Sequence, residues 1–121
     1  LDSSVIIAAF RKEEDHHRDA LGIFRHNTSF LLLDHVLFEM GTVLKMREGQ
    51  LISQRCLDFL LNTEGIDFMR ATDEEIQKSL LEFQEEENKK LSFVDTLLLV
   101  LHRTRNISLA TFDEDLQKKL S

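Results

Sequence analysis

The chain has 121 residues, of which 42% are hydrophobic and 31% are charged, and its net charge is −7. This balance is typical of a soluble cytoplasmic protein. No apolar run approaches the ~20 residues that a membrane span requires, which excludes a membrane-spanning chain. The length predicts one domain over residues 1–121, and the acidic charge argues against a general nucleic-acid binder, which is usually basic.

Hydrophobic periodicity predicts an alternation of helices and strands. His17, Ala20 and Phe24 recur at helical spacing, whereas the unbroken apolar run 29–33 is typical of a strand that helices cover on both faces. Leu1 has the character of the last inward residue of another strand, so we expect that strand to be short or to begin before Leu1. The predicted elements are, in order, a helical turn over 5–10, a helix over 14–25, a strand over 29–33, helices over 34–47 and 51–61, a strand over 66–70, helices over 72–87 and 92–105, a strand over 107–111 and a helical turn over 116–120.

Two local signals support the second half of this pattern. Thr72 and Glu75 have the spacing of a capping box, which marks the beginning of a helix. The helix that starts at Ser92 is apolar nearly all round, which places it in the interior, and Asn106 ends it. The whole pattern predicts an α/β fold of three layers, in which helices flank a central parallel sheet of four to five strands.

Acidic residues fall where predicted strands end or where helices begin. Asp2 follows the first strand, Asp95 lies at the head of the interior helix, and Asp113 comes just after the strand 107–111, with Asp115 as a fifth candidate. Glu39 lies about one turn into the helix 34–47. Because strand ends and helix heads share one edge of a parallel sheet, we expect these carboxylates to be neighbours.

Glu39 carries the strongest single signal. It lies three residues after Val36 and four before Val43, so we expect it on the apolar stripe of its helix, where an acid is costly unless something compensates its charge. The other acids have structural alternatives. Asp95 fits the capping-box partner of Ser92, and Asp2 and Asp113 fit turn or N-cap residues.

Carboxylates that converge repel one another, and hard divalent cations relieve that repulsion. Oxygen ligands without cysteine favour Mg²⁺ or Mn²⁺ over zinc. Such a site can activate a water and neutralise the charge that builds on a phosphodiester. We interpret His35 and His102 as structural or surface residues, and Cys56, at helical spacing with Ile52 and Leu60, as part of the core.

Four segments carry the acids: Asp2 with Ser3 and Ser4, HVLFEMGTVL around Glu39, LSFVDTLLL around Asp95, and LATFDED around Asp113. Together they resemble the PIN-domain nucleases, and especially the VapC-type toxins of toxin–antitoxin pairs. The resemblance implies hydrolysis of RNA that leaves a 5′-phosphate and a 3′-hydroxyl. It also implies that the four acids hold Mg²⁺ or Mn²⁺, or its waters. In the same way, the hydroxyls of Ser3 or Ser4 and of Thr111 are expected to orient carboxylates or water.

The resemblance also implies partners. A small antitoxin protein would cover the acidic edge, and a homodimer would build a longer groove for RNA. Basic residues that we expect near this edge are Arg11, Lys12, Lys45, Lys89 and Lys90. A non-catalytic PIN-like scaffold or RNA-binding subunit remains an alternative. A receiver-like phosphoacceptor module is disfavoured, because Asp2 is followed by Ser3 rather than by a second acid.

Overall fold

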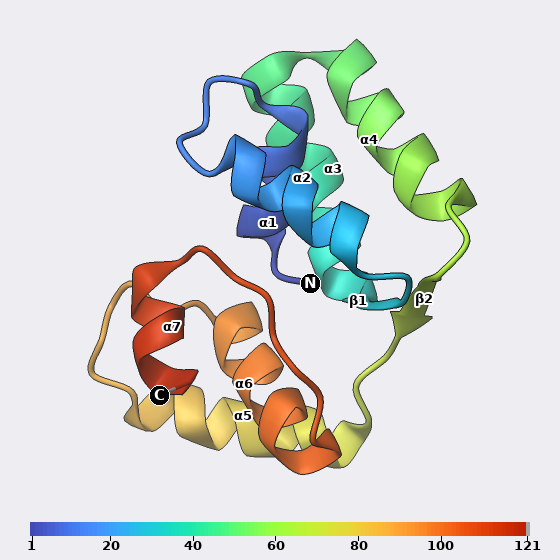
Figure 1. The fold of residues 1–121 in the computed structure, drawn as a ribbon. Coiled ribbons are helices and arrows are strands. Elements are labelled where there is room, and N and C mark those ends of the chain that lie inside the picture. The colour runs from blue at the N-terminus through green and yellow to red at the C-terminus, as the bar shows by residue number, and fades with distance from the viewer. Residues whose placement is uncertain (121) are drawn as a thin grey trace.

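The computed structural model describes residues 1–120, which form a helix-rich α/β fold (Figure 1). The strands β1 and β2 run parallel, with Phe30 opposite Ile66 and Leu33 opposite Met69. The elements are, in order, α1 (Ser3–Phe10), α2 (His17–His26), β1 (Phe30–Leu33), α3 (Asp34–Glu48), α4 (Gln50–Asn62), β2 (Ile66–Met69), α5 (Asp73–Glu85), α6 (Phe93–Arg105) and α7 (Glu114–Leu120).

Two groups of helices enclose the sheet, as the predicted three-layer class requires. Figure 1 shows α1 to α4 on one side and α5 to α7 on the other. Leu32 and Leu33 of β1 are fully buried and share one hydrophobic core with Leu98 and Leu101 of α6 and with Ile6 of α1. Each such side chain contributes about 1.5–3 kcal/mol of burial free energy, so this core fixes α1 and α6 against the sheet.

The sheet is less regular than the sequence predicts. Regular pairing in the part described, residues 1–120, is confined to β1 and β2, whereas Leu1 and residues 107–111, both predicted to be strands, have no regular secondary structure. Leu1 lies beside β1, because its nitrogen donates to the carbonyl of Leu31 (2.9 Å), and the 107–111 segment lies beside Asp2, whose nitrogen donates to the carbonyl of Ala110 (3.0 Å).

The structure agrees more closely with the predicted helices than with the predicted strands. Both capping boxes form, Thr72 with Glu75 at α5 and Ser92 with Asp95 at α6. The buried run from Leu97 to Leu101 confirms that α6 is an interior helix, and it ends at Asn106, whose φ of 53° is left-handed. Boundaries differ slightly, since α2 begins at His17 rather than 14 and α5 ends at Glu85 rather than 87. No helix within residues 1–120 is long and apolar enough to cross a membrane.

Candidate active site

Four acids from four separate segments come together at one edge of the sheet. In Figure 1, the beginning of α1, the head of α6 and the segment that leads into α7 meet at this edge. The charges of Asp2 and Asp113 both raise the pKa of Asp95, and the charges of Asp95 and Asp2 both raise the pKa of Glu39. The four carboxylates are therefore electrostatic neighbours, and we call this set the acidic cluster: Asp2, Glu39, Asp95 and Asp113.

Asp2 is the buried member of the acidic cluster, with 4% of its surface exposed. Its Oδ2 accepts hydrogen bonds from the hydroxyls of Ser4 (2.7 Å) and Thr111 (2.6 Å). The same two hydroxyls accept backbone N–H groups, Ser4 from Phe112 (2.9 Å) and Thr111 from Asp113 (3.0 Å). These bonds compensate a buried carboxylate and tie α1 to the last segment of the site.

Asp95 has both a structural and an electrostatic role. Its Oδ2 accepts the backbone N–H of Ser92 (2.9 Å), while its own N–H donates to the Ser92 hydroxyl (3.0 Å). Burial raises its pKa, the hydrogen bonds from Ser92 oppose that shift, and the charges of Asp2 and Asp113 add to it. Asp95 is thus the capping-box partner of Ser92, as the structural alternative predicted. The same hydrogen bonds hold its carboxylate in a fixed orientation beside the neighbouring acids.

Asp113 begins the last helix in a similar way. Its Oδ1 accepts the backbone N–H of Leu116 (3.0 Å) in the first turn of α7. Gln117, which the sequence did not single out, donates to the carbonyl of Thr111 (2.8 Å). The side chains of Asp113 and Gln117 therefore fix the turn between Thr111 and α7. No periodic signal in the sequence would have found Gln117.

The predicted burial of Glu39 is wrong. The inward stripe of α3 consists of Val36, Met40 and Leu44, and the Glu39 side chain is exposed at its margin. Its pKa is nevertheless raised, first by partial desolvation and then by the charge of Asp95, while His35 opposes the shift. Glu39 is rotated about 100° around the helix axis from its neighbour Met40, which faces the core. The spacing from Val36 was therefore not enough to predict whether Glu39 is buried.

Asp115 lies apart from the acidic cluster. Its Oδ1 accepts a hydrogen bond from the side-chain nitrogen of Asn88 (3.1 Å), in the connection between α5 and α6. Ser3 begins α1, and the hydroxyl that bonds Asp2 belongs to Ser4 instead. The structure thus brings together four of the five predicted acids, and places Asp115 at a hydrogen bond that secures a loop.

The remaining candidate residues have structural environments. His102 bonds the carbonyl of Ile107 through Nδ1, and His35 is exposed beside Asp34. Cys56 is fully buried, and burial raises the pKa of its thiol to about 12, so it is an inert core residue as predicted. Among the predicted basic residues, Arg11 is paired with Glu14 and Glu48. Lys12, Lys45, Lys89 and Lys90 are exposed.

The donor chemistry of the acidic cluster fits a hard divalent cation. Its candidate ligands are all carboxylates, and the pKa values of Glu39 and Asp95 are raised first by burial and then by the charges of neighbouring acids, which a cation would offset. Within residues 1–120, however, no three His, Cys, Asp or Glu side chains are arranged so that they could hold a metal ion as they stand. Because Asp2, Asp95 and Asp113 each bond a neighbouring group, side chains would have to turn to complete a coordination sphere.

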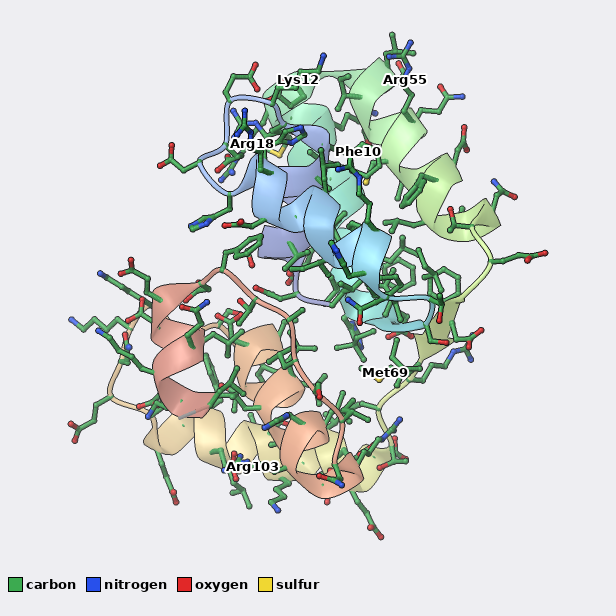
Figure 2. All side chains as sticks on the ribbon, viewed as in Figure 1. Phe10, Lys12, Arg18, Arg55, Met69 and Arg103 are labelled. Atoms are coloured by element: carbon green, nitrogen blue, oxygen red, sulfur yellow. The ribbon has the colours of Figure 1, made fainter. Side chains whose placement is uncertain are left out.

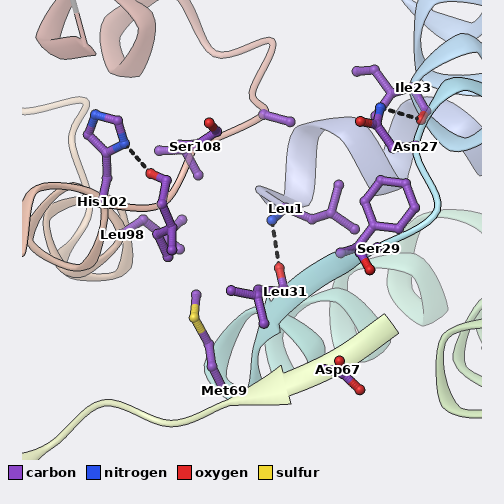
Figure 3. Close-up of a pocket in the computed structure, with 14 residues that line it drawn as sticks. Leu1, Ile23, Asn27, Ser29, Leu31, Asp67, Met69, Leu98, His102 and Ser108 are labelled. Carbon is purple, nitrogen blue, oxygen red and sulfur yellow. Dashed lines mark hydrogen bonds between the residues drawn. The ribbon is translucent and has the colours of Figure 1, made fainter. Parts of the chain in front are cut away.

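A separate cavity of about 490 Å³ is lined by residues of β1, β2, α6 and the segment 107–110. Figure 3 shows Leu1, Leu31, Met69 and Leu98 around it, with the bond from His102 to the carbonyl of Ile107 on one side. Its lining is largely apolar and includes none of the acidic cluster. The cavity therefore does not contribute to the chemistry of the acids.

Comparison with known proteins agrees with this geometry. A family model described as "PIN domain" matches residues 1–120. Among solved structures, the chain is similar to VapC20 of Mycobacterium tuberculosis, described as a sarcin–ricin loop cleaving toxin. The TM-score is 0.85 with 21% sequence identity, over 97% of this chain and 91% of that chain, so the likeness shows the fold. No protein of curated function matches the sequence. The resemblance read from the four sequence segments is confirmed.

Proposed function

This chain belongs to the PIN domain family, and from that premise we propose that it is an endoribonuclease that hydrolyses RNA phosphodiester bonds with Mg²⁺ or Mn²⁺. The observation that supports the proposal is the acidic cluster itself. Four carboxylates from four segments act on one another, and the most buried of them, Asp2, is held by two hydroxyls. A divalent cation bound at this edge would offset the repulsion between these acids.

The surroundings of each acid suggest which ones would bind the cation and which one would accept a proton. Asp2 and Asp95 are fixed by hydrogen bonds from Ser4, Thr111 and Ser92, so they would position the cation, together with Asp113. A bound Mg²⁺ or Mn²⁺ would supply an activated water and stabilise the charge that develops on the phosphodiester. Glu39, exposed and with a raised pKa, is suited to accept a proton from the attacking water.

The test is cleavage of an unstructured RNA by the purified protein with Mn²⁺ or Mg²⁺. Wild type should cleave, chelation should stop cleavage, and Asp95→Asn should abolish it. The amide oxygen of asparagine can still accept the Ser92 N–H, so the helix cap survives the substitution. Asp67→Asn is the matched control, because Asp67 is an exposed acid on β2 outside the cluster, and it should cleave as wild type does.

A non-catalytic scaffold or RNA-binding subunit is the second candidate. The capping bonds of Asp95 and Asp113 favour it, because they give both acids a structural reason to be present. If wild type and Asp95→Asn are equally inert on a broad set of RNAs with either metal, the scaffold function replaces the nuclease.

We extend the proposal to the partners and setting of the protein. The similarity to a VapC toxin supports a toxin of a toxin–antitoxin pair that acts in the cytoplasm, forms a homodimer and is inhibited by a small protein. That protein would cover the acidic cluster and insert a basic side chain among the carboxylates. Light scattering of the purified chain would give twice the monomer mass if the dimer exists.

A further inference from the structure

An imidazole ring lies against the turn that carries part of the acidic cluster. His16, in the connection between α1 and α2, stacks on Phe112 with ring centroids 4.5 Å apart and planes 11° from parallel. Figure 1 shows this connection beside the segment that leads into α7. Phe112 lies between Thr111 and Asp113, and its backbone N–H donates to the Ser4 hydroxyl that also bonds Asp2. The stacked pair is therefore held by the same hydrogen bonds as the buried acid.

The two rings differ in their exposure to solvent. Phe112 is half-buried, while 51% of the His16 side chain is exposed. His16 lies 3.9 Å from the carboxylate of Asp19, measured from Nδ1, and that carboxylate is itself exposed. The ring of Phe112 thus supports one face of the imidazole, and about half of the His16 side chain remains open to solvent.

Exposed acids (Glu13, Asp15 and Asp19) and exposed bases both lie around this ring. Lys12 and Arg18 are exposed near the same connection, and Figure 2 shows both side chains in that region. The chain contains no Tyr or Trp, and most of its phenylalanines pack against one another or the core. Base stacking on aromatic rings is tolerant of sequence, because every base has a π-face.

We infer that His16, supported by Phe112, is a substrate-binding residue that stacks on a nucleobase of the RNA next to the cleaved phosphodiester. The inference rests on the proposed ribonuclease function and adds a base-binding position to it. Lys12 and Arg18 would contact phosphates on the same side. The acidic cluster would position a cation and a phosphate, and the His16 ring would add a contact to a base.

The test measures binding of a short labelled single-stranded RNA by fluorescence anisotropy, in an Asp95→Asn background with Mn²⁺ at low salt. His16→Ala should weaken binding about tenfold, as expected for the loss of one stacked base. His16→Phe should restore it, and His16→Leu, which keeps an apolar side chain but no ring, should not. His26→Ala is the matched control, since His26 is an exposed histidine that bonds the carbonyl of Gly22 within its own helix.

A set of RNAs that each lack one base separates stacking from other roles. For one position of the missing base, His16→Ala should no longer weaken binding, and that position should lie beside the cleavage site of the wild-type enzyme. Equal weakening on every RNA would assign His16 to phosphate contact and overturn the inference, as would no weakening at all. Failure of the wild-type protein to cleave any RNA would count against the proposed function, whereas normal cleavage with an unchanged affinity for His16→Ala would count against this inference alone.

Discussion

The two capping boxes of this protein have the same local geometry and opposite electrostatics. Glu75 at α5 and Asp95 at α6 each occupy the third position of a helix, where the side chain accepts the N–H of the cap residue, Thr72 or Ser92. Yet the pKa of Glu75 is lowered to about 2, chiefly by hydrogen bonds from Arg105, whereas the pKa of Asp95 is raised by burial and by other acids.

The difference comes from residues that are distant in sequence. Arg105 donates to both carboxylate oxygens of Glu75 (2.9 and 2.7 Å) and to the carbonyl of Arg70 (2.7 Å). Asp95 faces Asp2 and Asp113 instead. Glu75 thus has a cationic neighbour, whereas Asp95 has two anionic neighbours. The repulsion between acids is therefore confined to the edge that carries Asp95, and a metal ion would be attracted there.

The largest expected effect follows from removing the buried charge beside Asp95. Asp2→Asn should reduce RNA cleavage by at least about 100-fold, because Asp2 is the member of the cluster that two hydroxyls hold in place. Initial rates on an unstructured RNA with Mn²⁺ would measure this. Circular dichroism should show an unchanged helix content, and a variant that cleaves at the wild-type rate would exclude Asp2 from the site.

A smaller loss should follow when the support of Asp2 is removed but the acid is kept. Thr111→Val deletes the hydroxyl that bonds Asp2 and accepts the N–H of Asp113, and we expect about tenfold slower cleavage. Thr104→Val is the matched control, since the Thr104 hydroxyl bonds only within α6 to the carbonyl of Val100 among the bonds described. Equal rates for both variants would show that the hydroxyl of Thr111 does not position Asp2 for catalysis.

The same contrast explains what the sequence could predict. The capping boxes, the interior character of α6 and the parallel class follow from local spacing and composition, and all are present. The position of Glu39 depends on helical rotation by a single residue, and the stacking of His16 on Phe112 joins residues 96 positions apart. Tertiary contacts of that kind leave no periodic trace, so neither the exposure of Glu39 nor the role of Gln117 could be predicted.

At the capping box of α5, loss of the Glu75 charge should destabilise the protein. Glu75→Gln should lower the free energy of unfolding at pH 7 by about 1–2 kcal/mol, because Arg105 loses its bidentate partner. The depressed pKa of Glu75 stabilises the fold above the ordinary value of 4.5, and this contribution fades as pH falls toward about 2. Urea unfolding at several pH values would measure it, with cleavage unchanged. A deficit that is as large at pH 2 as at pH 7 would mean that packing, and not charge, is responsible.

Asp95→Asn should have the smallest effect on stability, with the opposite sign. A raised pKa means that the folded protein binds the proton more tightly than the unfolded chain, so the ionised carboxylate lowers stability as pH rises above its ordinary value of 3.8. The amide cannot ionise and still accepts the Ser92 N–H, so without metal the variant should melt slightly higher than wild type at pH 7 and lose this advantage below pH 3.8. Adding Mn²⁺ should raise the melting temperature of wild type more than that of the variant, because the cation relieves a repulsion that the variant has already reduced. If Asp95→Asn instead lowers stability at pH 7 as Glu75→Gln does, the two capping acids are equivalent and the acidic cluster holds no stored repulsion for a metal ion to relieve.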